Sequence, residues 1–214
     1  MNQSERRNYL IQKLLEEQPQ YAKMQIPGRC EEQKMLLRSL MNIRMPGKIS
    51  KEFQQIQDAY LAEENAAKGV VTPADMEELS PEIYLWKGDI TRLQVGAIVN
   101  AANSGMTGCY QPCHNCIDNC IHTYAGIELR NYCNDIMQRQ GYAEPTGQAK
   151  ITPAFNLPCD YVIHTVGPIV QGRLKEEHER LLVSCYEACL RIAEENNIES
   201  IAFCCISTGV FMFP

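Results

Sequence analysis

The sequence predicts an α/β domain built in layers and preceded by an N-terminal helical segment, and two patterns support this fold class. Residues 1–80 hold three helical stripes of apolar residues, whereas from residue 81 short apolar runs alternate with longer helical patterns. Strands that alternate with helices indicate a sheet whose faces are covered by helices. We therefore expect a helical extension with a linker at 1–80 and an α/β domain at 81–214.

The first 80 residues are expected to form three helices and a linker. The stretch "SERRNYLIQKLLEEQ" has Ser4 as a candidate cap and an apolar stripe made of Leu10, Ile11, Leu14 and Leu15. The stretches "CEEQKMLLRSLMNIR" and "SKEFQQIQDAYLAEENAAK" repeat this pattern, and Pro-Gly pairs separate the three helices. The polar stretch "GVVTPADMEELSPE" then predicts a linker with one helical turn. We interpret the three helices as scaffold.

Five strands and two helices are expected in the α/β domain. Strands are predicted at "IYLWKGDIT" and "AIVNAAN", followed by one helix over "IDNCIHTYAGIELRNYCNDIMQRQ". Two further strands, "AKITPAFNL" and "YVIHTVGP", precede a long helix at "KEEHERLLVSCYEACLRIAEENN". A buried strand at "SIAFCCIS" leads into the final residues, "TGVFMFP".

Three polar turns follow apolar strands in this domain: "GDIT" at 88–91, "NAANSG" at 100–105 and "STGVF" at 207–211. Each turn alone is an ordinary surface turn, because Gly, Ser, Thr and Asn favour turns everywhere. Ligands of α/β sheets collect where strands end and glycine-rich turns begin. Together the turns therefore indicate backbone N–H groups that line a cleft for phosphate or sugar.

Composition excludes some classes of protein. The hydrophobic share is 45% and the charged share 21%, which is typical of globular domains. The net charge of -6 argues against a nucleic-acid partner, whose binding would rest on basic phosphate contacts. No apolar run approaches the ~20 residues of a membrane span, and the charged N-terminus is unlike a secretory signal.

The chain contains eleven cysteines, an odd number, without a signal for secretion. A disulfide framework is therefore not expected, and we predict a reduced protein of the cytoplasm. The spacing of Cys185 and Cys189 on a helical pattern predicts two buried small side chains. We interpret Cys204 and Cys205, in the last apolar run, in the same way.

The succession "GDIT…AIVNAAN…IDNCIHTYAG…PTGQAKITPAFNLP…YVIHTVGP…IAFCCISTGV" resembles the macrodomain family, whose members are three-layer α/β/α domains with a mixed sheet that bind ADP-ribose. The resemblance covers residues 83–214. It implies that Asp89 binds the adenine amino group, that Ile90 contacts the base, and that Asn103 reaches the distal ribose. It also implies a wider set of ADP-ribose-binding residues: Cys116, Ile117, Asp118, Ser207, Thr208, Gly209, Val210 and Phe211.

The resemblance also marks differences from the family. Macrodomains usually have Gly at the position of Met212, and they continue with a helix, a strand and a final helix, so we expect the domain to extend past Pro214. Between "NAAN" and the following helix, "GMTGCYQPCHNC" replaces the usual glycine-rich loop. In that helix Asp118 and His122 match the family's Asp and His, and we interpret Cys120 and His122 as packing residues.

The replaced loop holds Cys109, Cys113, His114 and Cys116, a mixture of thiol and imidazole that is typical of zinc sites. In an extended loop His114 and Cys116 point to the same side and Cys113 points away, which favours Cys109, His114 and Cys116 as three ligands. One zinc ion per chain with an open fourth position is the catalytic arrangement. This set is similar to the zinc-containing macrodomain subgroup. The alternatives are a closed four-ligand structural site and a redox-active Cys113–Cys116 pair.

These observations predict an enzyme: a zinc-dependent, glycosidase-type hydrolase that removes mono-ADP-ribose from proteins, with Asn103 and Asp118 as catalytic residues. Asp118 would act as a base or as a ribose anchor. The alternative is a reader that binds ADP-ribosylated partners without turnover, with zinc in a structural role. Resemblance to the zinc subgroup implies a lipoyl-carrier protein, modified by a microbial sirtuin, as the substrate protein and ADP-ribose as the product, with no membrane or nucleic-acid partner.

Overall fold

The computed structural model describes residues 1–21 and 23–214, and its N-terminal part contains the three predicted helices. They are α1 (Gln3–Glu16), α2 (Cys30–Ile43) and α3 (Lys51–Ala67). The cap of α1 is Asn2, so the prediction of Ser4 is wrong by two residues. Asn2 accepts a hydrogen bond from the N–H of Glu5, and the Glu5 carboxylate accepts one from the N–H of Asn2, both at 2.9 Å. This reciprocal pair fixes the start of the helix.

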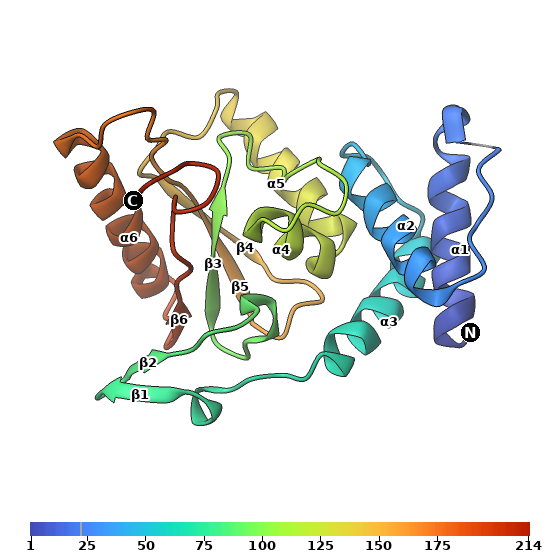
Figure 1. Ribbon diagram of the computed structural model, residues 1–214, viewed down its shortest axis with the longest axis horizontal. Coiled ribbons are helices and arrows are strands. Elements are labelled where there is room, and N and C mark those ends of the chain that lie inside the picture. The colour runs from blue at the N-terminus through green and yellow to red at the C-terminus, as the bar shows by residue number, and fades with distance from the viewer. Residues whose placement is uncertain (22) are drawn as a thin grey trace.

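The three helices form a layer with a hydrophobic core of its own (Figure 1). The predicted stripe of α1 is buried there against Leu37 of α2 and Tyr60 of α3. Ile127 joins this core from the α/β domain. The contact between the layer and the domain is otherwise rich in buried polar side chains, which are Asn42, Gln57, Asn65 and Arg130.

In the sequence, a short hairpin lies between the helical layer and the central sheet. The predicted linker contains the expected helical turn at Pro73–Asp75, but it then forms strand β1 (Glu77–Ser80). This strand pairs antiparallel with β2 (Ile83–Leu85), and all seven residues are exposed. The strand predicted at Ile83 is therefore shorter than expected and lies outside the central sheet. The hairpin also spans the predicted boundary between residues 80 and 81.

The central sheet is mixed, as predicted, with the strand order β4-β5-β3-β6. Strands β3 (Ala97–Ala102), β5 (Tyr161–Val166) and β6 (Ile201–Ala202) run parallel, and β4 (Ala149–Pro153) is antiparallel to β5. The last strand is shorter than "SIAFCCIS" predicts, because pairing with β3 stops at Ala202. Beyond it Cys204 is half-buried and Cys205 is exposed, so the prediction that both are buried is wrong for Cys205.

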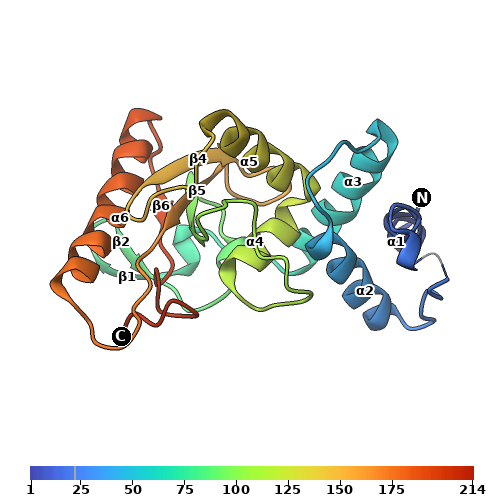
Figure 2. The same cartoon turned by 90° about the horizontal axis from the view of Figure 1, so that it is seen from above.

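Helices cover both faces of this sheet and complete three layers (Figure 2). One face carries α6 (Glu176–Glu195), whose Cys185 and Cys189 are fully buried against the strands, as predicted. The other face carries α4 (Ile117–Ala125) and α5 (Ile127–Gln140). The sequence predicted a single helix here, and Gly126 breaks it with a φ of 103°, which a side chain would rarely adopt. No helix in the described residues is long and apolar enough to cross a membrane.

The parallel strands bring two of the three polar turns, at 100–105 and 207–211, to one edge of the sheet, whereas the turn at 88–91 follows β2 of the hairpin. Asn103 follows β3, Gly167 follows β5, and Ser207 lies beyond β6. Helix α4 begins beside this edge, and on its outer side it contacts α2 and α3 of the helical layer. The edge of the sheet, the start of α4 and the helical layer together surround the loop at 103–116.

Candidate active site and metal centre

A hydrogen-bonded pair, Asn103 and Asp118, lies at the edge of the sheet. The Asn103 Nδ2 donates to Asp118 Oδ2 at 3.1 Å and to the carbonyl of Gly108 at 3.2 Å. The Asn103 Oδ1 accepts from the N–H of Gly105 at 2.9 Å. These contacts orient the amide of Asn103 and place it between the end of β3 and the first turn of α4. The structure thus brings together the two residues predicted to be catalytic.

Asp118 is buried, and its surroundings shift its ionisation. Burial raises the pKa of this carboxyl to about 6, because a charged group loses solvation inside the protein. Hydrogen bonds from Asn100 and Asn103 and the positive charge of Arg130 favour the ionised form and offset part of this effect. A carboxyl with a pKa near neutrality is suited to exchange protons at physiological pH.

A buried network of hydrogen bonds orients Asp118, and the sequence patterns did not lead us to predict it. Asn100 Nδ2 donates to Asp118 Oδ1 at 2.8 Å and lies 3.0 Å from His164 Nδ1. Burial lowers the pKa of His164 to about 3, so the ring is neutral and Nδ1 is the acceptor. His164 Nε2 then donates to Thr152 Oγ1, at 3.0 Å. The polar residues inside the apolar runs "AIVNAAN" and "YVIHTVGP" could have indicated this hydrogen-bond network.

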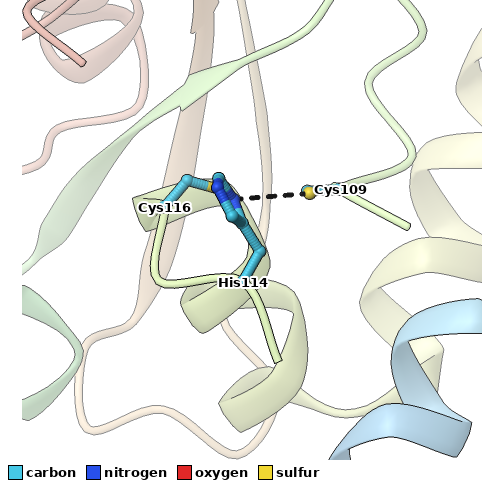
Figure 3. Close-up of side chains that lie close together, drawn as sticks. All are labelled: Cys109, His114 and Cys116. Carbon is cyan, nitrogen blue, oxygen red and sulfur yellow. Dashed lines mark hydrogen bonds between the residues drawn. The ribbon is translucent and has the colours of Figure 1, made fainter. Parts of the chain in front are cut away.

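The three predicted metal ligands, Cys109, His114 and Cys116, converge on one point (Figure 3). One donor atom from each lies within 4.8 Å of the others, and Cys109 Sγ is 3.8 Å from His114 Nδ1. Figure 3 shows Cys109 approaching from the side opposite to His114 and Cys116. Two thiols and one imidazole at this spacing are a donor set that fits zinc.

Cys116 has a second role, because its side chain caps α4. Its Sγ accepts a hydrogen bond from the N–H of Asn119 at 3.4 Å. Burial, with smaller contributions from the neighbouring Cys109 and Asp118, raises the pKa of the Cys116 thiol to about 12. A thiolate at this position therefore requires a nearby positive charge, which a metal ion supplies.

Cys113 lies outside the group of three. Its Sγ is 3.2 Å from Ser39 Oγ and 3.5 Å from the carbonyl of Met35, both on α2. The residue has a φ of 52°, an uncommon left-handed conformation that turns its side chain away from His114 and Cys116. A redox pair between Cys113 and Cys116 has no support in this arrangement, because the two thiols face different neighbours.

A second group of possible ligands lies in the core: His122, Cys133 and His164 also approach within 4.8 Å. All three are buried. His164 already bonds to Asn100 and Thr152, and burial lowers the pKa of His122 well below its ordinary value. Gly108 packs directly on the His122 ring, where a Cβ would lie 2.7 Å from Cγ. We interpret His122 as a packing residue, as the sequence predicted.

The residues assigned to the adenine end lie on a short helical turn before β3. Ile90 begins this turn (Ile90–Arg92), which packs against α4. Asp89 caps the turn, since its Oδ1 accepts from the N–H of Thr91 at 3.0 Å and from its hydroxyl at 2.7 Å. The second carboxylate oxygen of Asp89 makes no hydrogen bond within the described residues. Ile117, at the start of α4, is half-buried on the same side of the sheet.

The turn at 207–211 forms a closed loop at the sheet edge. The N–H of Phe213 donates to the carbonyl of Ser207 at 2.9 Å, and the N–H of Val170 donates to that of Phe211 at 2.8 Å. In the described part of the chain, the N–H groups of Gly209, Val210 and Phe211 have no acceptor. Thr208, by contrast, bonds back to Cys205 through its N–H and its hydroxyl.

Two residues of this loop have positive φ angles without being glycine. Met212, where macrodomains usually have Gly, has a φ of 56°, and Ser207 has one of 65°. The hydroxyl of Ser207 is buried without a hydrogen-bond partner in the described residues and lies against Gly167, where no Cβ would fit. Free amides and a buried hydroxyl are groups that bind phosphate oxygens.

Comparisons with known proteins agree with this fold. The family model described as "Macro domain" matches residues 99–214. A protein of Treponema medium, named protein-ADP-ribose hydrolase, is 60% identical over 218 residues that cover 100% of this chain and 84% of that protein. A protein of the same name from Staphylococcus aureus is 43% identical and is matched over 98% of this chain and 79% of its own length.

Two solved structures also resemble this chain. The Oceanobacillus iheyensis macrodomain with bound ADP is 39% identical with a TM-score of 0.54, covering 59% of this chain and 65% of that one. The Trypanosoma brucei macrodomain in complex with ADP-ribose is 28% identical with a TM-score of 0.60, covering 83% of this chain and 76% of that one. The fold class predicted from the sequence is confirmed, and the chain belongs to the macrodomain family.

Proposed function

We propose that this protein is a zinc-dependent hydrolase that removes mono-ADP-ribose from modified proteins. One observation carries the proposal: the group of Cys109, His114 and Cys116 lies beside the Asn103–Asp118 pair. Asn103 bonds to the carbonyl of Gly108, which precedes Cys109, and Cys116 caps the helix on which Asp118 lies. The relatives named protein-ADP-ribose hydrolase support the same reaction.

Different residues bind the two ends of ADP-ribose. Asp89 and Ile90 bind adenine, and the loop at 207–211 binds the diphosphate through its free amides. Cys116 and Ile117 line the pocket at the start of α4. Asn103 and Asp118 then face the distal ribose, where the bond at the anomeric carbon breaks. This assignment of the ADP-ribose-binding residues rests on their match to the macrodomain pattern and, for Asn103 and the loop at 207–211, on their common position at the sheet edge.

In the reaction, Asn103 orients a ribose hydroxyl, and Asp118 either anchors the ribose or accepts a proton from the attacking water. The carboxylate of Asp118 is suited to both roles, since Asn100 and Asn103 fix its orientation and burial brings its pKa close to the working pH. Cys109, His114 and Cys116 would hold one zinc ion, which would supply Lewis acidity to the reaction. Breaking an anomeric bond passes through an oxocarbenium-like state, which a nearby carboxylate stabilises.

The setting of the enzyme follows from the same proposal. We assign residues 81–214 to the ADP-ribose-processing domain and residues 1–80 to the helical extension and its linker. The described cysteines are unpaired, which supports a reducing, cytoplasmic location. The resemblance to the zinc subgroup supports a lipoyl-carrier protein, modified by a microbial sirtuin, as the substrate.

The proposal is tested by metal content and turnover of the purified protein. We expect about one zinc per chain, lost in Cys109→Ser, His114→Ala and Cys116→Ser. Cys113→Ser is the matched control and should keep the metal, because its thiol faces Ser39.

Turnover is then measured on proteins that carry mono-ADP-ribose on acidic residues, serine or arginine, and on a modified lipoyl-carrier protein. A chelator should abolish turnover while circular dichroism shows an unchanged fold. Full activity in folded, metal-free protein would refute zinc dependence. Tight ADP-ribose binding without turnover on any linkage would instead indicate a reader.

A further inference from the structure

The N-terminal helical layer reaches the candidate metal loop through one arginine of α2. Arg38 Nη2 donates to the carbonyl of His114 at 2.7 Å and to Asn119 Oδ1 at 3.0 Å, and it lies 3.5 Å from Cys120 Sγ. Arg38 is 76 residues from His114 in sequence, yet it bonds directly to the backbone of a candidate ligand. A charged donor makes stronger hydrogen bonds than a neutral one, particularly where water is partly excluded.

Asn119 extends this contact to the other two candidate ligands. Its side chain is fully buried, and its Nδ2 donates to the carbonyls of Cys109 at 3.3 Å and Gln111 at 2.9 Å. Its backbone N–H donates to the Sγ of Cys116. The guanidinium of Arg38 also fixes the orientation of the Asn119 amide, because a flipped amide would turn its NH₂ group toward a cation.

The same helix holds the turn between the ligands in its unusual conformation. Asn42 Oδ1 accepts from the N–H of Cys113 at 2.9 Å, and Asn42 Nδ2 donates to Thr123 Oγ1 of α4 at 2.9 Å. Cys113 has a positive φ, a conformation that persists where neighbours stabilise it. Residues of α2 therefore contact the loop at Cys113 and His114, between the first and last ligand.

We propose that Arg38 and Asn119 are positioning residues of the candidate zinc site, so that the helical layer sets its metal affinity. The inference rests on the proposed function, since it presupposes that Cys109, His114 and Cys116 bind zinc. Each of the three is tied by a hydrogen bond to this pair: Cys109 and His114 through their carbonyls, and Cys116 through its thiol. Outer groups that orient metal ligands typically change metal affinity by about 10–100-fold when they are removed.

The test measures zinc affinity in the whole chain by competition with a chelating dye, together with the rate of zinc release. Arg38→Ala should weaken zinc binding by about 10–100-fold and speed its release. Arg38→Lys keeps the charge but not the planar fork, so its affinity should lie between those of wild type and Arg38→Ala. Arg29→Ala removes an equal charge from the residue just before α2, whose side chain is 85% exposed, and it should leave the affinity unchanged.

The outcomes separate this inference from the proposed function. If the wild type binds no zinc, both fail. If the wild type binds zinc and Arg38→Ala binds it equally well, the positioning role is wrong and the metal site stands. If Arg38→Ala does not fold, as judged by circular dichroism, Arg38→Lys decides: a folded protein with wild-type zinc affinity and release rate overturns the inference.

Discussion

Replacing Asp118 by asparagine keeps the shape of the side chain and removes its charge, which isolates the proposed chemical role. Asp118 now accepts from two donors, Asn100 Nδ2 at 2.8 Å and Asn103 Nδ2 at 3.1 Å. An amide at this position offers one oxygen and one NH₂ group, so one of these two buried donors must face another donor. An unpaired buried donor costs about 1–3 kcal/mol, and we expect Asp118→Asn to lose stability in this range.

The effect on turnover should be much larger than the effect on binding. A positioned proton acceptor typically contributes about 10²–10⁴-fold in rate, so Asp118→Asn should slow ADP-ribose release from a modified protein by about 10²-fold or more. The affinity for free ADP-ribose should fall by less than about tenfold, or ~1.4 kcal/mol, since adenine and diphosphate contacts are untouched. Asn103→Ala should show the same separation of rate from affinity.

Three measurements on each variant decide the matter: urea unfolding, calorimetry with ADP-ribose, and release of ADP-ribose from a modified protein. Asp135→Asn, an exposed carboxylate on α5, is the matched control and should match wild type in all three. Zinc content should survive in Asp118→Asn, because this residue is not a proposed ligand. Turnover within about threefold of wild type, in protein that retains zinc, would refute the role of Asp118.

Three further predictions concern other regions. Asp89→Ala should weaken ADP-ribose binding by about 1–3 kcal/mol in calorimetry, because it leaves the adenine amino group unpaired; unchanged affinity would contradict the adenine assignment. Lys68 Nζ is buried over the Tyr124 ring without a hydrogen-bond partner in the described residues, and burial lowers the pKa of Lys68 to about 8 from 10.5. Between pH 8 and pH 10.5 the unfolded chain therefore binds more protons than the folded chain. The free energy of unfolding should rise as the pH increases across this window. Lys68→Met should remove this rise in thermal melts and increase Tm at pH 7, and a persisting rise would exclude Lys68 as its source. Arg130→Met should lower the free energy of unfolding in urea by about 1.5–3 kcal/mol, since Arg130 donates to the carbonyls that end α2; a loss below about 1 kcal/mol would argue against that role.

Local sequence patterns were sufficient to predict much of the fold. The apolar stripes of the three N-terminal helices and the buried runs around Ile98 and Ile163 gave elements close to those observed. The convergence of Cys109, His114 and Cys116 was predictable because all three lie within eight residues, where chain geometry limits the possible arrangements. The break at Gly126 was not predicted, since the helical spacing of apolar residues continues through it.

Contacts between distant segments could not be predicted from one sequence. Arg38 resembles any charged residue on an amphipathic helix, and nothing near it in sequence indicates a partner 81 residues away at Asn119. The same holds for Asn100 and His164, which lie in separate strands and meet only because these strands pair in register. Strand β1 of the hairpin was missed for a different reason: its exposed residues, "EELS", lack the alternation that marks a half-buried strand.

The polar contact between the helical layer and the α/β domain has a mechanical consequence. Gln57 is fixed on both sides, donating to Glu128 at 2.6 Å and accepting from the N–H of Ile127 at 3.0 Å, and Asn65 donates to the carbonyls of Tyr124 and Asn156. Two apolar surfaces can shift relative to each other at a small cost in free energy. Hydrogen bonds between buried groups are directional, so they are all satisfied in only one alignment. The helical layer should therefore either separate from the α/β domain as a unit or keep its position. A substrate protein that binds the loop at 109–116 would then contact a loop held rigidly by the layer behind it.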